Sequence, residues 1–371
     1  MQYSIFVFFI FMFSSMVKLE SSKIVIEVLR HGARNPIENI EPFEVKKSRE
    51  YLSDLTPVGI KEHFNLGRLI QKKYKHFITT GLSSSEMALF SSDKKRSIMS
   101  LQAHLQGIFF KTHRPTTENQ DITSLWSPPS VQDLGNYKQI HKTAAIPSRS
   151  IFPLDIQNKE KDFLFLAHHI CPKTKLQMEE FDQNNEDLIS IFNPTDTLLK
   201  QNGFNVKEMF PGKPRLYNYI KVCSFIISDI WSENKNQINF NLLAQCMILE
   251  HVFLSSLYDN DQLLEVALNK MFSKIKQNLQ DFQHGLKFKK LMIFSGHDDN
   301  LNAIILRLLN KNNIQCTISN YQNIIKQNIQ DINQFQQIIQ SLNSNNCFTT
   351  TPFASNLIFE VFEGIVINYF R

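Results

Sequence analysis

Two arginines and a histidine stand close together early in the chain, within the run Arg30-His31-Gly32-Ala33-Arg34-Asn35-Pro36. An arginine carries a permanently charged, forked head group that suits the oxygens of a phosphate. A histidine between such groups can act as a nucleophile on phosphorus. These residue types at this spacing indicate chemistry on a phosphate group, and the inference depends on how the chain holds them.

The segment before this run is predicted to form a buried strand. Lys23–Leu29 is short, apolar and rich in β-branched residues. Gly32 relaxes the backbone directly after it, and Pro36 prevents the strand from simply continuing. Open α/β sheets bind their ligands at the carboxyl ends of strands. The first motif is therefore predicted to lie at the ligand-binding edge of a sheet.

A second polar motif follows another apolar segment, far along the chain. Leu291–Phe294 predicts a strand, and His297 and Asp298 follow its end. Asp298 or Asp299 can cap a helix whose apolar residues recur at helical spacing. A His-Asp pair alone carries little information, but this pair occupies the same position relative to a strand as the first motif.

A third candidate, Arg96, lies between these motifs. Glu86–Ser92 predicts another buried strand, Asp93 a helix N-cap, and the residues from Lys94 onward a helix with one apolar face. Arg96 falls in the first turn of that helix, where a cation opposes the helix dipole. A phosphate bound at the helix N-terminus would resolve this misfit.

Together these motifs resemble those of the histidine acid phosphatases, within the wider branch that includes the phosphoglycerate mutases. The matching segments are Arg30-His31-Gly32-x-Arg34-x-Pro36, Ser91 to Arg96 and Ser295-Gly296-His297-Asp298. The resemblance alone selects Arg96 over Lys94 and Lys95. The Leu-Thr-x-x-Gly pattern at Leu55–Gly59 is also similar, and it implies packing against the sheet.

The resemblance implies roles for six side chains. His31 would be the nucleophile that forms a phosphohistidine, with its other ring nitrogen held by an acceptor. Asp298 would protonate the leaving alcohol, and the charge of a bound phosphate would raise the pKa of its carboxyl. The residues implied to bind the phosphoryl oxygens are Arg30, Arg34, Arg96 and His297. Because three arginines supply positive charge, no metal and no other cofactor is implied.

The fold implied is α/β: a doubly wound mixed sheet flanked by helices, with an inserted, mainly helical cap domain. The expected division is a signal peptide at 1–21, a phosphatase core at 22–157 and 241–371, and a helical cap at 158–240. Periodicity predicts further helices at Pro57–Tyr74, Asn241–Leu264 and Val266–Leu286. It also predicts a strand at Asn356–Phe362 with a hairpin partner within Gly364–Phe370.

Composition and the N-terminus indicate a secreted globular protein. Hydrophobic residues make up 42% of the 371 residues and charged residues 20%, which excludes a disordered chain. The net charge of +5 comes without a long block of like charges, which argues against nucleic acid as a partner. An apolar run to Phe13, followed by Ser14 and Ser15, predicts a signal peptide that ends before Ser22. The expected location is secreted or in the lysosomal or vacuolar lumen, with no stable membrane span after signal removal; an uncleaved membrane anchor is the alternative.

Five cysteines leave at least one unpaired within the chain. The resemblance implies that the cysteine of Cys171-Pro172 pairs with a cysteine in a C-terminal tail. Because this chain ends at Arg371, that disulfide is not expected here. The remaining expectation is a Cys316–Cys347 disulfide. It would close Thr317–Asn346, which is either a helix or a low-complexity surface insertion.

The sequence thus predicts an acid phosphatase whose partner is a small-molecule phosphate monoester, with a homodimer left open. Two other classes remain: phosphoglycerate-mutase-like phosphotransfer, and a non-catalytic secreted protein that binds phosphate. The signal segment, the cap and His297-Asp298 argue against the first, and the complete set of six site residues argues against the second. His168 and His169, in the expected cap, are predicted to be surface or packing residues rather than ligands.

Overall fold

The computed structural model describes residues 23–38, 40, 52–75, 78, 82–109, 152–231, 239–309, 351–362 and 365–370, together with scattered positions between 318 and 338. The predicted signal peptide and the Cys316–Cys347 disulfide lie outside the described residues, as does most of Thr317–Asn346.

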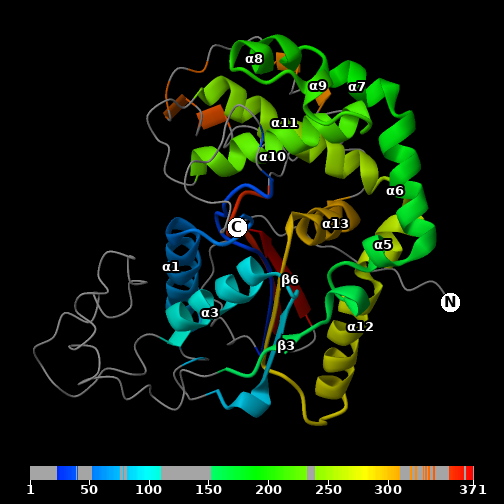
Figure 1. The fold of residues 1–371 in the computed structure, drawn as a ribbon. Helices are drawn as coiled ribbons and strands as arrows, with labels where there is room; N and C mark the ends of the chain where they lie inside the picture. The colour runs from blue at the N-terminus through cyan, green and yellow to red at the C-terminus, as the bar shows by residue number, and fades with distance from the viewer. Residues whose placement is uncertain are drawn as a thin grey trace, which may run out of the picture.

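Six strands form one mixed sheet in the order β3-β2-β4-β1-β5-β6 (Figure 1). They are β1 (Ile24–Arg30), β2 (Met87–Ser91), β3 (Asp155–Ile156), β4 (Leu291–Gly296), β5 (Asn356–Phe362) and β6 (Ile365–Phe370). β4 pairs in parallel with both β1 and β2, whereas β5 runs antiparallel to β1 and β6. The strands predicted at the motifs and the C-terminal hairpin are confirmed, with ends that differ by about one or two residues.

Helices cover both faces of this sheet, as the doubly wound class requires (Figure 1). The flanking helices are α1 (Pro57–Lys73), α3 (Lys95–Phe109), α12 (Asp261–Gln283) and α13 (Asp298–Leu309). Ile26 and Val28 of β1 belong to one hydrophobic cluster with α12 and α13, whereas Val25 and Leu29 belong to another with α1 and α3. Successive side chains of a strand point to opposite faces, so a central strand covered on both sides is apolar throughout.

α1 and α3 approach each other at a pair of glycines. A Cβ atom on Gly67 would lie 2.1 Å from the carbonyl oxygen of His104, and one on Gly107 would lie 2.1 Å from that of Phe64. No larger side chain fits at either position without moving the backbone. This close contact fixes α3, and with it Arg96, against the rest of the core.

A mainly helical segment lies over the end of the sheet at which β4 leads into α13 (Figure 1). Its helices are α5 (Ala167–Ile170), α6 (Pro172–Asn184), α7 (Glu186–Phe192), α8 (Thr195–Gln201), α9 (Val206–Met209) and α10 (Arg215–Trp231). α11 (Phe240–Leu257) shares a hydrophobic cluster with α7, α8 and α10, so by packing it belongs with them. The division of the chain into core and cap at residues 157/158 and 240/241 stays a prediction.

The two helices before β4 meet at a different place from the one predicted. Asn260 separates them, whereas the predicted helices Asn241–Leu264 and Val266–Leu286 would meet near residue 265. The Asn260 side chain accepts hydrogen bonds of 3.0 and 3.2 Å from two backbone N–H groups in the first turn of α12, and so starts that helix. α11 is also buried on most sides rather than amphipathic.

Among the described residues, α11 is also the one helix long and apolar enough to cross a membrane by length and composition, with a mean hydropathy of 1.3. The sequence prediction counted no such segment after the N-terminus. Here 61% of the helix is buried inside the protein. A helix that is apolar on most sides is equally suited to the core of a large globular domain.

Candidate active site

Strand pairing brings the sequence motifs to one edge of the sheet. In the parallel pair β1–β4, Arg30 lies opposite Gly296, so the two main motifs follow adjacent strand ends. In the pair β2–β4, Ser91 lies opposite Ser295, which brings the start of α3 to the same edge. The six predicted site residues therefore converge, although they come from three distant parts of the chain.

His31 is buried at the centre of this group, with 2% of its surface exposed. Its Nδ1 lies 2.9 Å from the carbonyl oxygen of Gly32, which can only accept a hydrogen bond. Burial, followed by the positive charge of Arg96 and other nearby cations, lowers the pKa of His31 well below its ordinary value. We therefore assign a neutral ring with the hydrogen on Nδ1, which leaves a lone pair on Nε2.

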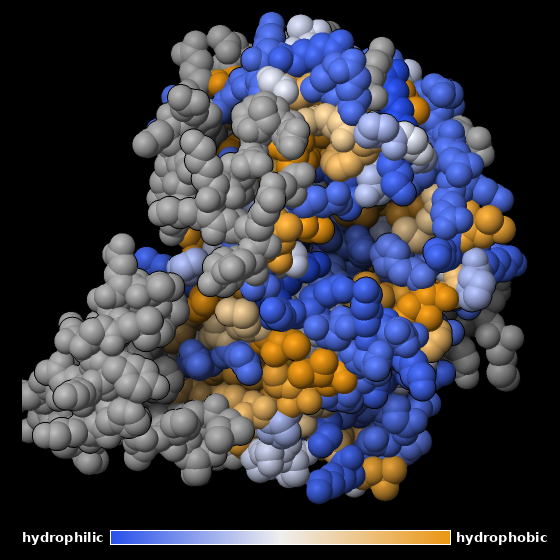
Figure 2. Space-filling model, viewed as in Figure 1, coloured by the Kyte–Doolittle hydropathy of each residue, from blue (hydrophilic) through white to orange (hydrophobic). Residues whose placement is uncertain are grey.

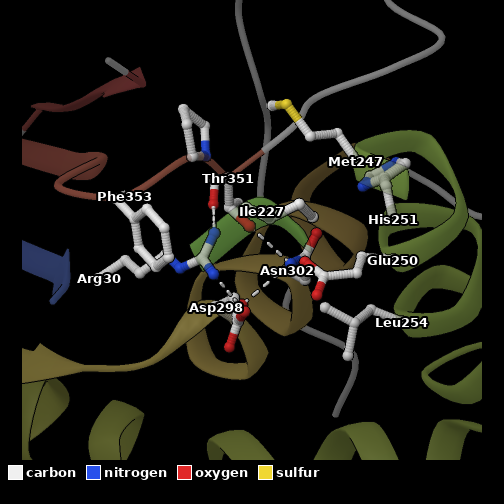
Figure 3. A pocket seen from close by; sticks show the side chains of 11 residues that line it. Arg30, Ile227, Met247, Glu250, His251, Leu254, Asp298, Asn302, Thr351 and Phe353 are labelled. Atoms are coloured by element: carbon white, nitrogen blue, oxygen red, sulfur yellow. Dashed lines mark hydrogen bonds and ion pairs between the residues drawn. The ribbon is translucent and has the colours of Figure 1, made fainter. Parts of the chain in front are cut away.

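Contacts on three sides hold Arg30 in the pocket (Figure 3). Its Nη2 lies 2.8 Å from Oδ2 of Asp298, and its Nη1 donates a hydrogen bond to the carbonyl oxygen of Thr351. Its guanidinium carbon lies 4.5 Å from the centroid of the Phe353 ring. The forked head group is thus positioned before any ligand binds, which suits recognition of a phosphate.

Arg34 extends from the core into the helical segment above it. Its Nη1 donates to Oγ of Ser228 at 2.8 Å and its Nη2 to Oγ of Ser224 at 2.9 Å, both on α10. Burial, and then repulsion by Arg96, lower the pKa of Arg34 to about 9. The side chain remains a cation at neutral pH, and a bound anion would offset the repulsion.

His297 and Arg96 complete the cationic side of the site. Nε2 of His297 lies 3.0 Å from Oγ of Ser92, and its backbone N–H donates to Oδ1 of Asn300 at 2.9 Å. The ring centroids of His297 and His31 lie 5.5 Å apart. Arg96 is partly buried in the first turn of α3, and its charge lowers the pKa of both histidines.

The predicted caps of the two helices at the site are wrong in detail. Asp298 is the first residue of α13 rather than its cap, and its Oδ2 pairs with Arg30. α3 begins at Lys95, and the carbonyl oxygen of Lys94 accepts backbone hydrogen bonds from its first turn. Because the carboxylate of Asp298 does not cap α13, it can face the pocket.

The Leu-Thr-x-x-Gly pattern positions the loop that follows β1. The Thr56 hydroxyl caps α1 by accepting a hydrogen bond from the backbone N–H of Gly59 at 3.1 Å, and it donates to the carbonyl oxygen of Ala33 at 2.9 Å. A Cβ atom on Gly32 would lie 2.5 Å from the carbonyl oxygen of Gly59. The packing role predicted for this pattern therefore includes the loop that carries His31.

A pocket lies between this edge of the sheet and the helices above it, with about 440 Å³ of empty space including its open mouth. On the visible face, hydrophilic residues border the recess between the two parts (Figure 2). The core contributes Arg30, Asp298, Asn302, Thr351, Pro352 and Phe353; α10 and α11 contribute Ile227, Met247, Glu250, His251 and Leu254.

Of the residues that line this pocket, the sequence analysis proposed only Arg30 and Asp298 for the site; Glu250 and Phe353 are among those that it missed. Glu250 is half-buried and extends from α11 toward Asp298 and Asn302 (Figure 3). Desolvation raises the pKa of Glu250 to about 7, against the opposing effect of the charge on Arg30. The only sequence signal for Glu250 is a carboxylate inside an otherwise apolar helix. Phe353 lies in the short segment before β5, and no sequence pattern marks it as a site residue.

Comparison with known proteins defines the class of this site. Residues 23–368 match the family described as the histidine phosphatase superfamily (branch 2). The chain belongs to that family, whose members are phosphatase-type hydrolases that act on phosphate esters.

Relatives and solved structures agree with this assignment. The prostatic acid phosphatase of Homo sapiens is 23% identical over 301 residues, which cover 77% of this chain and 69% of the relative. The lysosomal acid phosphatase of Rattus norvegicus is 22% identical over 307 residues, or 79% and 64% of the two chains. The multiple inositol polyphosphate phosphatase of Bifidobacterium longum has a TM-score of 0.55 at 11% identity, over 96% of this chain and 88% of its own. The phytase of Citrobacter braakii has a TM-score of 0.54 at 13% identity, over 92% and 81%. At these identities the solved structures support the fold.

Proposed function

We propose that this protein hydrolyses phosphate monoesters in two steps through a phosphohistidine at His31. The observation that carries the proposal is the setting of this side chain: it is buried, its Nδ1 lies 2.9 Å from the carbonyl oxygen of Gly32, and burial together with nearby cations lowers its pKa. This setting favours a neutral ring that keeps a lone pair on Nε2. Arg30, Arg34, Arg96 and His297 have the charge and hydrogen-bonding groups to hold the phosphoryl oxygens.

In the first step, Nε2 of His31 attacks phosphorus and the bond from phosphorus to the ester oxygen breaks. The protonated carboxyl of Asp298 gives its proton to the leaving alcohol. Oδ2 of Asp298 lies 2.8 Å from Nη2 of Arg30. An incoming phosphate competes with the Asp298 carboxyl for that guanidinium.

In the second step, water attacks the phosphorus of the phosphohistidine. The bond from phosphorus to Nε2 breaks, the carboxylate of Asp298 accepts a proton from the water, and inorganic phosphate leaves. His31 returns to its neutral state. The same carboxyl thus serves as acid and then as base, and the cycle closes without a further reactant.

The relatives and the pocket together favour an acid phosphatase, secreted or in a lysosomal or vacuolar lumen. Relatives named prostatic and lysosomal acid phosphatase support the location. Glu250 supports the acid range, because a carboxyl with a pKa of about 7 is neutral in acid and repels a phosphate ester once it ionises.

The test is phosphate release from an aryl phosphate between acid and mildly alkaline pH, with a chelator present. We expect turnover that peaks on the acid side, and acid-labile phosphate bound to the protein when the reaction is quenched rapidly. His31→Ala should lose both signals, whereas the matched variant at an exposed histidine, His284→Ala, should keep them. The proposal is overturned if His31→Ala still turns over the substrate. If the unchanged protein binds phosphate without turnover, the binding-protein class is favoured. If it transfers the phosphoryl group to another alcohol instead of releasing phosphate, the mutase class is favoured.

Asp298→Asn tests the proton donor. We expect it to slow esters with poor leaving groups, such as alkyl phosphates, by much more than esters with good ones, such as nitrophenyl phosphate. A poor leaving group needs its proton in the transition state and a good one does not. Equal slowing of both classes would remove Asp298 from this role.

A further inference from the structure

Two adjacent histidines and an aspartate converge beside the active site without taking part in the proposed reaction. His168 and His169 belong to α5, and Asp299 is the second residue of α13. Nε2 of each histidine lies 3.5 Å from the same carboxylate oxygen, Oδ2 of Asp299. One ligand atom from each of the three residues lies within 4.8 Å of the other two. Among the described residues this is the one such group that could hold a metal ion.

The spacing of these atoms is wider than that of a hydrogen bond. A donor nitrogen and an acceptor oxygen normally lie about 2.7–3.2 Å apart. A tetrahedral zinc ion with nitrogen and oxygen ligands at about 2.0–2.1 Å separates those ligands from one another by about 3.3–3.4 Å. The two nitrogen-to-oxygen distances of 3.5 Å are close to that edge length. Because all three atoms lie within 4.8 Å of one another, a modest movement of the side chains would let them share one ion.

The cluster is closed on one side and open on the other. The side chain of His168 is 1% exposed, whereas those of Asp299 and His169 are 22% and 46% exposed. A metal ion can therefore enter from solvent, and a water or an anion can occupy a fourth position. The hydroxyl of Tyr258 lies 3.1 Å from Nε2 of His168 and is the further polar neighbour at the buried end. An ion bound to this nitrogen would displace the hydroxyl from it, and the hydroxyl could then hydrogen-bond to a water bound to the ion.

We propose that His168, His169 and Asp299 bind a divalent transition-metal ion of the zinc class. Two imidazoles and one carboxylate are a ligand set that suits zinc, with one position left for solvent. The ion joins α5 to the start of α13, one residue beyond Asp298. This inference is independent of the proposed function, because the phosphohistidine cycle takes no step through these three residues.

The test is equilibrium dialysis of the untagged full chain against Zn²⁺, with bound metal measured by atomic absorption. We expect one ion per chain and a rise in Tm that EDTA reverses, since an ion that binds only the folded state stabilises it. His169→Ala should weaken binding by at least about tenfold, the lower end of what even outer-shell partners contribute. This residue is half-exposed, so its variant should fold. His284→Ala, which removes an exposed histidine outside the cluster, should leave the affinity unchanged.

Co²⁺ gives a second readout, because its visible absorption reports the number and geometry of its ligands. We expect a four-coordinate spectrum that His169→Ala removes. The His31→Ala variant should still bind Zn²⁺ while losing turnover, so the two proposals can fail separately. If Zn²⁺ does not bind, or binds equally well to the His169→Ala variant, the cluster is a packing contact as the sequence predicted, and the proposal is overturned.

Discussion

At the scale of single residues, the surroundings of His31 would allow it to serve as the proposed nucleophile in acid. An ordinary histidine, with a pKa near 6.5, would be protonated there and would lack a lone pair. Burial and the charge of Arg96 lower the pKa of His31, so the neutral ring persists to lower pH. The cations that would bind phosphate therefore also prepare the nucleophile.

Arg96→Ala tests two effects at once: the binding of phosphate and the lowered pKa of His31. We expect inhibition by inorganic phosphate to weaken by about tenfold or more, since a hydrogen bond to a charged group contributes about 1.5–3 kcal/mol. The acid limb of kcat/KM should also move to higher pH, because the pKa of His31 rises when this positive charge is removed. The matched control is Lys95→Ala, an exposed neighbour in the same turn. Unchanged phosphate inhibition in Arg96→Ala would show that the start of α3 does not bind phosphate.

Glu250→Gln tests the pocket carboxyl that sequence reasoning missed. Because the pKa of Glu250 is raised to about 7, the side chain is mostly neutral below that pH and mostly anionic above it. The glutamine variant should match the unchanged protein at pH 5 and show a lower KM for an aryl phosphate at pH 8. The measurement is KM against pH for both proteins. A pH profile that does not change on the alkaline side would show that Glu250 is too far from the phosphate to affect its binding.

At the scale of helices and strands, the contact between α1 and α3 depends on Gly67 and Gly107. Gly67→Ala places a methyl group against the carbonyl oxygen of His104, a backbone atom that can move only with its helix. We expect a loss of about 1–3 kcal/mol in the free energy of unfolding, as for other overpacked sites. Urea denaturation measures it, and Gln106→Ala at an exposed position of α3 is the control. Equal midpoints for both variants would mean that the two helices can separate at no cost.

The elements that could be predicted are those whose signals are local. Buried strands such as β1 and β4 are short apolar runs, and Thr56-Pro57 is an unambiguous helix start, so these were placed to within a residue or two. The break at Asn260 was missed because the apolar periodicity continues across it. The phosphate-site residues could be proposed because they lie in motifs directly beside such elements.

The features that could not be predicted depend on contacts between distant segments. Glu250 lies 220 residues from Arg30 in the sequence (250 minus 30), and only the packing of α11 over the sheet edge brings it into the same pocket. The convergence of His168 and His169 on Asp299 has the same origin, since α5 and α13 are distant in the chain. Periodicity describes one element at a time and carries no information about such neighbours.

At the scale of the whole molecule, Arg34 links the sheet edge to the helices above it. It follows β1 and donates hydrogen bonds to Ser224 and Ser228 on α10. These two hydroxyls come from the segment expected to form the cap. If Arg34 binds phosphate as proposed, its contacts with that segment would couple the placement of the segment to the affinity of the site.

Replacing both serines by alanine tests this coupling. The Ser224→Ala/Ser228→Ala variant removes two acceptors of the buried Arg34 guanidinium and leaves the carbonyl oxygen of Asn35, 3.1 Å from Nη1, so the orientation of the side chain toward the phosphate is less tightly fixed. We expect KM for an aryl phosphate to rise by about tenfold, corresponding to roughly 1.4 kcal/mol, with a smaller fall in kcat. Ser228→Ala alone should give part of the effect, because Ser224 still holds the other nitrogen. Ser273→Ala, at an exposed serine of α12, is the control and should leave both constants unchanged. If the double variant behaves like this control, Arg34 is positioned by the core alone, and the helices above the sheet do not influence phosphate binding through it.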